Sequence, residues 1–297
     1  MRVGIVDIGS NTARLLVADV DGGDVAPVAS EREYLGLGAV IADTGTLRRK
    51  TIAETARVVS WFADEARELG VQRAQVIVTA PGRQGRASDA LVAALREATR
   101  FPVAILGSDE EGRLAYDGAV ARLEDRSVCV RVGVVDVGGG STELGVGDGT
   151  TGATWLRSVE LGSLRLTRLA LASDPPSKRE LGQARAAAAA AFRDVRPPRP
   201  ALALATGGSA RAVAKLVGPM FDADDVDTAV AILAGRRSAK VARRAGIDPD
   251  RAGTVLAGAL LLAEASRALR RPLRLARGGL REGAALALAS ERRLAAA

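Results

Sequence analysis

Two short segments of the chain place an aspartate at the end of an apolar stretch and follow it with a turn of small residues. The first is Val6–Thr12 and the second is Val135–Ser141, and they match in register at their apolar, Asp, apolar and Gly positions. Backbone N–H groups of such turns can converge on an anion. Because a carboxylate repels phosphate, Asp7 and Asp136 are better suited to hold a cation or its water shell. A single Asp-x-Gly is often only a hairpin turn, but the matched pair predicts a phosphate site.

A third glycine loop, Ala205–Arg211, is predicted to join a strand to a helix. This would bring N–H groups and the positive end of the helix dipole to one point, although the loop alone is equally compatible with a plain turn. The chain contains no Gly-x-x-x-x-Gly-Lys-Ser/Thr, so a P-loop enzyme is excluded, and Gly145–Gly149 is predicted to be a turn rather than a dinucleotide-binding loop.

The residue types present limit the chemistry. The sequence has no histidine and a single cysteine, Cys129, which excludes Ser-His-Asp triads, Cys-His pairs, His-ligated zinc and an intramolecular disulfide. Proton transfer near neutral pH therefore falls to Asp or Glu. Metal ligands must be oxygen atoms, which favours Mg²⁺ or Mn²⁺.

Charge and apolar patterning bear on partners and location. The net charge is +7 and all but four of the 42 basic residues are arginine, which suits a polyanionic ligand, although a solvated basic surface is the plainer interpretation. Aromatic residues make up 3%, so a nucleic-acid partner is weakly supported. The amino terminus lacks a signal-peptide pattern, and the longest apolar run, Val255–Ala263, is shorter than the roughly 20 residues of a membrane span. We expect a cytoplasmic protein that binds neither nucleic acid nor membrane.

These loops need strands and helices to position them, and the apolar spacing predicts both. Expected strands are Arg2–Asp7, Ala13–Asp19, a third strand after the turn Asp21–Asp24, Gln75–Ala80, Val103–Leu106, Val128–Val137, Thr142–Val146 and Ala201–Ala205. Expected helices are Thr51–Leu69, Ala87–Thr99, Asp109–Leu123, a segment through Ala186–Ala191, Ser209–Leu216, Val226–Leu233, Ala252–Leu269 and Leu280–Leu294. The repeated loops predict two lobes of similar topology, at residues 1–124 and 125–297, with the last helix, about 280–297, an element that can pack back on the first lobe.

A set of motifs spread along the chain closely resembles the exopolyphosphatase/guanosine pentaphosphate phosphatase family, in order and spacing. The motifs are Asp7–Thr12, Thr79–Arg83, Gly107–Leu114, Asp136–Glu143, Leu161–Thr167, Ala205–Arg211 and Gly279–Gly283. The chain runs only a short way past Gly283, as in a short form without the family's C-terminal helical domain. It also has Gly253 where the family commonly has Asp.

This resemblance implies an α/β fold of two ribonuclease-H-like lobes, as in the actin/Hsp70/sugar-kinase superfold, with the active site in the cleft between them. Glu111 matches the family's catalytic glutamate, the general base that activates water. Asp7, Asp136 and Glu143 are expected to hold Mg²⁺ or Mn²⁺ or to position that water. The expected phosphate-binding residues are Gly9, Ser10, Asn11, Thr12, Arg83, Gly138, Gly139, Gly140, Ser141, Thr142, Gly207, Gly208 and Ser209. The less favoured interpretation of Glu111 is a first-turn acid that stabilises a helix dipole, and the less favoured interpretation of Arg83 is an ordinary surface arginine.

The resemblance implies an exopolyphosphatase that releases terminal orthophosphate from inorganic polyphosphate by metal-assisted in-line attack of water. Three alternatives stay open: a guanosine pentaphosphate 5′-phosphohydrolase, an ATPase of the same superfold and a non-catalytic polyphosphate sensor. The expected partner is polyphosphate or guanosine pentaphosphate. Whether the protein forms a homodimer stays open too.

Overall fold

The structure of the protein is a computed structural model that describes residues 1–84, 86, 88–123 and 130–290. The chain divides into two compact units. The first comprises Met1–Leu114 and the residues from Leu280 onward, and the second comprises Ala115–Gly279. The division falls inside helix α5 (Ser108–Val120), whereas the expected lobe boundary at residue 124 lies outside the described residues.

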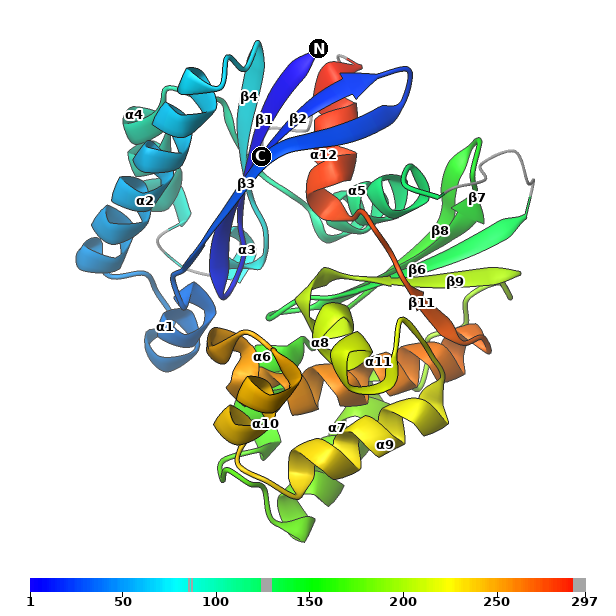
Figure 1. The fold of residues 1–297 in the computed structure, drawn as a ribbon. Coiled ribbons are helices and arrows are strands. Elements are labelled where there is room, and N and C mark those ends of the chain that lie inside the picture. The colour runs from blue at the N-terminus through cyan, green and yellow to red at the C-terminus, as the bar shows by residue number, and fades with distance from the viewer. Residues whose placement is uncertain (85, 87, 124–129, 291–297) are drawn as a thin grey trace. The chain divides into compact units, whose positions relative to one another are not determined.

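The first unit contains a five-stranded mixed sheet with the order β3-β2-β1-β4-β5 (Figure 1). Strands β1, β2 and β3 form an antiparallel meander, and β4 and β5 run parallel to β1. The strands are β1 (Arg2–Ile8), β2 (Thr12–Asp21), β3 (Asp24–Tyr34), β4 (Arg73–Val78) and β5 (Val103–Ile105), and the helices are α1 (Leu37–Thr44), α2 (Arg49–Glu68), α3 (Ala80–Gln84), α4 (Ser88–Thr99), the first part of α5, and α12 (Leu280–Ala289).

Side-chain alternation gives this sheet two apolar faces. Val6 and Ile8 belong to the cluster that buries α2 and α4, whereas Val3 and Ile5 belong to a second cluster with apolar residues of α5 and α12. Asp7 follows Ile5 by two positions, so strand periodicity places it on the face that α12 covers. The first core is therefore two-sided, with α12 supplying part of one side.

The second unit contains a six-stranded mixed sheet with the order β10-β11-β9-β6-β7-β8. Strands β6, β7 and β8 form an antiparallel meander, β9 and β11 run parallel to β6, and β10 is an antiparallel edge strand. The strands are β6 (Arg131–Val137), β7 (Thr142–Asp148), β8 (Gly152–Val159), β9 (Leu202–Thr206), β10 (Met220–Phe221) and β11 (Leu273–Leu275), and the helices are α6 (Ser163–Ala170), α7 (Lys178–Phe192), α8 (Gly207–Val217), α9 (Ala223–Ala234), α10 (Ser238–Ala245), the 3-10 helix η1 (Pro249–Thr254) and α11 (Val255–Leu269).

Omitting β10, the second sheet repeats the strand order of the first, with β8-β7-β6-β9-β11 in place of β3-β2-β1-β4-β5. The predicted α/β fold with two units of similar topology is therefore confirmed. Val135 and Val137 of β6 face the cluster formed with α7, α9 and α11, while Val132 and Val134 face Tyr116 of α5. Strand alternation places Asp136 on the Tyr116 face.

Most predicted elements are present with shifted ends. The prediction of a turn at Gly145–Gly149 is wrong for its first residues. Gly145 and Gly147 lie within β7 and pair with β8. Elements α1, α6, α10, β8, β10 and β11 were not predicted, since they are short or lack clear periodicity. Three predictions fall partly outside the described residues: the start of one helix at Ala87, the strand start at Val128 next to Cys129, and the end of the last helix at Leu294.

The stretch Pro249–Leu269 is long and apolar enough, by length and composition, to cross a membrane. In the structure 67% of its apolar window is buried inside the fold, and most of α11 packs into the second core. Burial in a globular core accounts for this apolar composition.

Candidate functional site

The two aspartate loops predicted from the sequence form equivalent turns. The Gly9 N–H donates to the Thr12 carbonyl and the Gly138 N–H donates to the Ser141 carbonyl, at 3.0 Å in both cases. These turns connect β1 to β2 and β6 to β7. The sequence repeat therefore corresponds to a repeated backbone turn, one in each unit.

In the first unit, backbone N–H groups at the start of α1 and just before it donate hydrogen bonds to the carbonyls of the loop. The Ser10 carbonyl accepts a hydrogen bond from the Gly38 N–H at 2.7 Å, and the Asn11 carbonyl accepts from Leu35 at 2.8 Å and Gly36 at 3.0 Å. Ser10 is buried. Within the described residues the Asn11 Oδ1 atom is buried without a hydrogen-bond partner, so it is available to a group that the protein itself does not supply.

Arg83 and Glu111 form an ion pair in the first unit. The Arg83 Nη1 atom lies 2.8 Å from Glu111 Oε2 and also donates to the Leu106 carbonyl at 2.7 Å. The two side chains are only 18% and 12% exposed, so Arg83 is not an ordinary surface arginine. Glu111 lies in the first turn of α5, where a carboxylate also favours the helix dipole.

The position of Arg83 depends on its neighbour Gly82. A Cβ atom at Gly82 would lie 2.9 Å from Ile105 Cγ2, so glycine allows α3 to lie close against β5. Among the described residues, Arg83 Nη2 and the neighbouring Gln84 Nε2 are buried donors without a hydrogen-bond partner. These donors point to an acceptor from outside the chain. The sequence reasoning did not identify Gln84, because an amide in a five-residue helix carries no spacing signal.

In the second unit Asp136 and Glu143 are directly opposite each other on antiparallel β6 and β7, which places their side chains on the same face. Glu143 is buried and its Oε1 accepts a hydrogen bond from Ser158 Oγ at 3.0 Å. Asp136 also pairs in register with Thr206 at the end of β9. The carboxylates therefore lie where the third glycine loop begins.

Gly207 lies against Asp136. Its φ is +84°, and a Cβ atom there would lie 2.3 Å from Asp136 Oδ1. Only glycine fits this approach, which brings the aspartate carboxylate to the N-terminus of α8. The Ser209 Oγ donates to the Val137 carbonyl at 3.2 Å, which ties α8 to the end of β6.

Arg251 is a further residue of this site that the sequence reasoning did not assign. A Cβ atom at Gly208 would lie 2.0 Å from the Arg251 guanidinium carbon, so the guanidinium lies directly over the glycine loop. The sequence signal for this residue is its place in the Arg251-Ala252-Gly253 segment. Of that segment, the sequence analysis discussed only Gly253. A guanidinium at a helix N-terminus adds positive charge where an anion would bind.

The Gly138–Thr142 turn is anchored through its carbonyls. The Gly138 carbonyl accepts from Ser163 N at 2.9 Å, and the Gly139 carbonyl accepts from Leu164 N at 3.0 Å. A Cβ atom at Gly162 would lie 2.5 Å from the Gly139 carbonyl group, so a glycine is needed there too. Thr142 is fully buried and its hydroxyl donates to the Leu161 carbonyl at 2.8 Å, so its side chain holds the turn in place.

The predicted site residues thus form two sets. Asp7, the Gly9–Thr12 turn, Arg83 and Glu111 belong to the first unit, and Asp136, the Gly138–Thr142 turn, Glu143 and the Gly207–Ser209 loop belong to the second. Within the described residues no three Asp, Glu, His or Cys side chains gather closely enough to hold a metal ion by themselves. Asp136 and Glu143 are hard oxygen donors on one face, which fits Mg²⁺ or Mn²⁺ if phosphate oxygens and water complete the shell.

The chain is similar in sequence to a phosphatase family and to named exopolyphosphatases. The sequence profile of the Ppx/GppA phosphatase family matches residues 16–291. Exopolyphosphatase 1 of Mycobacterium leprae is 29% identical over 286 residues, which cover 91% of this chain and 84% of that protein. Exopolyphosphatase 2 of Mycobacterium tuberculosis is 32% identical over 196 residues, 62% of this chain and 59% of that protein.

Two solved structures share the fold. A Ppx/GppA family member from Aquifex aeolicus superposes with a TM-score of 0.83 at 23% identity, covering 99% of both chains. An exopolyphosphatase from Cytophaga hutchinsonii superposes with a TM-score of 0.87 at 18% identity, covering all of both chains.

Proposed function

Because the chain belongs to the Ppx/GppA phosphatase family and is therefore a phosphatase-type hydrolase, we propose that it is an exopolyphosphatase that releases terminal orthophosphate from inorganic polyphosphate. The observation that carries this proposal is the buried Arg83–Glu111 pair. It holds a carboxylate in a fixed orientation beside Arg83 Nη2, a buried donor that has no hydrogen-bond partner in the described residues.

In the proposed mechanism Glu111 accepts a proton from the attacking water. The ion pair with Arg83 fixes the orientation of the Glu111 carboxylate, and a general base must be held in position to accept a proton. A phosphate oxygen of the substrate is the proposed acceptor for Arg83 Nη2. Positioning and neutralisation of charge supply most of the rate of phosphoryl transfer, so fixed donors contribute directly.

The second unit supplies phosphate-binding groups in this proposal. The N-terminus of α8, the Gly138–Thr142 turn and the Arg251 guanidinium favour an anion. Asp136 and Glu143, together with Asp7 of the first unit, are the proposed ligands or water-positioning groups for Mg²⁺ or Mn²⁺. The metal ion, when bound, neutralises the negative charge of the phosphate oxygens.

A phosphate-release assay in Mg²⁺ across short and long polyphosphate, guanosine pentaphosphate and ATP tests the proposal. We expect release from polyphosphate. A preference for guanosine pentaphosphate would identify the chain as the phosphohydrolase alternative that the family name equally allows. Release from ATP alone would identify an ATPase, and binding without release from any substrate would identify a sensor.

A further inference from the structure

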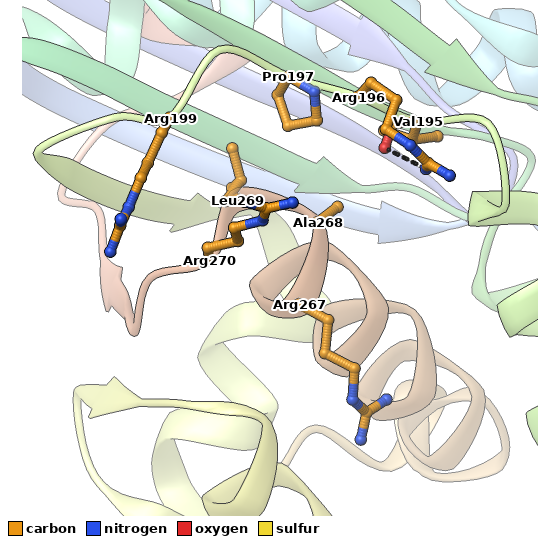
Figure 2. Close-up of a pocket in the computed structure, with 8 residues that line it drawn as sticks. All are labelled: Val195, Arg196, Pro197, Arg199, Arg267, Ala268, Leu269 and Arg270. Carbon is orange, nitrogen blue, oxygen red and sulfur yellow. Dashed lines mark hydrogen bonds between the residues drawn. The ribbon is translucent and has the colours of Figure 1, made fainter.

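A cavity of about 400 Å³ lies in the second unit between the loop before β9 and the end of α11 (Figure 2). Four arginines line it: Arg196 and Arg199 from the loop, and Arg267 and Arg270 from the helix end. Figure 2 shows Arg196 and Arg199 on opposite sides of this hollow. The remaining lining residues are apolar, and none is aromatic. The reaction proposed above makes no use of this cavity.

The arginines are held on a rigid framework. The loop reads Arg196-Pro197-Pro198-Arg199-Pro200, so three of its five residues have a fixed φ. The Arg271 Nε atom donates to the Pro200 carbonyl at 3.0 Å, which fastens the loop to the end of α11. Leu269 and Pro200 also both lie close to Gly133. A Cβ atom added at Gly133 would lie 3.0 Å from Leu269 and 3.1 Å from Pro200. Such a loop loses little conformational entropy when a ligand binds.

Among the described residues, most of the positive charge at this cavity is not neutralised. Arg267 pairs with Glu264 at 2.5 Å and with Asp227 at 3.3 Å. In contrast, within the described part of the chain the side chains of Arg196, Arg199 and Arg270 form no ion pair, and Arg196 donates only to the Val195 carbonyl at 3.1 Å. Three guanidinium groups around one cavity suit several linked anionic groups better than a single one.

Arg270 supports this interpretation through its backbone. It caps α11 with a φ of +53°, a conformation in which glycine is usual and in which another residue costs roughly 1–2 kcal/mol. The chain therefore retains an arginine at a position where glycine would be more stable. A guanidinium with a binding role would offset that cost.

The cavity is separate from the glycine loops of the same unit. The Arg196–Pro200 loop precedes β9 and the Gly207–Ser209 loop follows it. The five residues of β9 therefore separate them by about 17 Å at roughly 3.3 Å per residue. Asp136 lies at the Gly207 end of the parallel strands. A ligand in this cavity is thus out of reach of those carboxylates.

We propose that this arginine cavity binds a chain of linked phosphate groups and acts as a second contact point for polyphosphate. The absence of aromatic lining residues gives a nucleobase no stacking surface, which favours a phosphate chain over a nucleotide. The identity of the ligand rests on the proposed function, whereas the oligophosphate chemistry of the cavity does not.

Direct binding tests the cavity without turnover. Tripolyphosphate, orthophosphate and ATP are titrated into the Glu111→Gln enzyme and into the same enzyme carrying Arg199→Gln and Arg270→Gly. Arg270→Gly removes the guanidinium and also relieves the positive φ, so the melting temperature should stay equal or rise. The matched control replaces the exposed Arg236 and Arg243 with Gln, which removes the same net charge elsewhere on the second unit.

We expect two classes of tripolyphosphate site, one of which weakens at least tenfold in the cavity variant and stays unchanged in the control. Orthophosphate should bind more weakly than tripolyphosphate. Equal tripolyphosphate binding in cavity and control variants would overturn the proposal, and so would a loss confined to ATP, which would mark a nucleotide site.

Hydrolysis in the Glu111 wild-type background separates this inference from the proposed function. The cavity variant should raise KM for long polyphosphate about tenfold and leave kcat/KM for tripolyphosphate unchanged. An equal KM increase for long polyphosphate in the control would assign the effect to net charge and overturn the inference. If no variant releases phosphate from polyphosphate, the proposed function fails, while the titrations still decide whether the cavity binds oligophosphate.

Discussion

Glu111 and its neighbour Glu110 have the same side chain but different surroundings. The whole Glu111 residue is 9% exposed and its carboxylate is paired with Arg83, whereas Glu110 is half-buried. Adjacent helical residues point about 100° apart, so both cannot face the same water. Glu111→Gln should lower turnover roughly 100-fold to 10,000-fold, the usual contribution of a general base.

Substrate affinity of Glu111→Gln should persist, because the substitution keeps the size of the side chain and removes a negative charge near a polyanion. Glu110→Gln is the matched control, and its turnover should fall less than about tenfold. Steady-state rates and polyphosphate affinity of both variants check this. If Glu110→Gln proved the more damaging change, the base would be Glu110.

Arg83 is expected to affect stability as well as substrate binding. Arg83→Ala removes the guanidinium that contacts the buried Glu111 carboxylate, and breaking a buried ion pair costs about 3–5 kcal/mol. The side chains are 18% and 12% exposed, so we expect a loss near the lower end of that range. Adding Glu111→Gln to Arg83→Ala should recover about 1 kcal/mol or more, because it removes the buried carboxylate charge that the Arg83 guanidinium had balanced.

Urea unfolding of the wild type, both single variants and the double variant measures this coupling. Strictly additive free energies would mean that the ion pair does not contribute in solution. For activity, Arg83→Ala should raise KM for polyphosphate and reduce its salt dependence, since Arg83 Nη2 is a proposed phosphate donor.

Among single elements, the loop that opens α8 is the most constrained. Gly207→Ala places a side chain on a residue with a positive φ. The added Cβ atom would also lie 2.3 Å from Asp136 Oδ1, so Asp136 must move. We expect loss of most turnover and a destabilisation of at least about 1–2 kcal/mol. Gly182→Ala is the control within α7, where nothing lies within 4 Å of the added Cβ. It should retain activity and gain about 0.5–1 kcal/mol. Equal activity in the two variants would contradict the role assigned to the loop.

Helix α7 predicts a pH dependence of stability. Hydrogen bonds from the Ser177 hydroxyl and backbone to the Glu180 carboxylate lower its pKa from 4.5 to about 2. Because the folded-state pKa lies below the unfolded value, the stabilisation is fully present above about pH 4.5 and is lost as the pH falls toward 2.

Glu180→Gln should therefore be less stable than the wild type at neutral pH, and the difference should shrink between pH 4.5 and pH 2. Urea unfolding at several pH values measures it. A difference that stays constant over that range would show that Glu180 does not titrate as proposed.

At the scale of the whole molecule, activity should require a divalent cation. Asp136 and Glu143 are assigned to a polyanionic substrate, and without a cation these carboxylates would repel it. Excess chelator should abolish phosphate release, Mg²⁺ or Mn²⁺ should restore it, and Asp136→Ala should lose it at all metal concentrations. Full activity in chelator would exclude this role for the carboxylates.

The features that could be predicted from the sequence are those determined by residues that are neighbours in the chain. The Asp7 and Asp136 turns were found because strand, aspartate and small residues follow one another, and the repeated strand order follows from them. The Arg83–Glu111 contact and the contact of the Arg251 guanidinium with Gly208 join residues far apart in the chain, so spacing along the sequence could not show that these residues meet. The arginine surplus was visible, but its gathering around one cavity depends on the Arg196–Pro200 loop meeting the end of α11.

The placement of α12 has a consequence for biosynthesis. Residues Leu280–Ala289 complete one face of the first sheet, where Val3, Ile5 and Leu16 are buried together with Ala284 and Ala285. A ribosome makes that sheet long before it makes this helix. Until then this apolar face of the nascent first unit lacks its covering helix, whereas the second unit is contiguous in the chain. The catalytic candidate Glu111 therefore belongs to a unit that folds fully only late in translation.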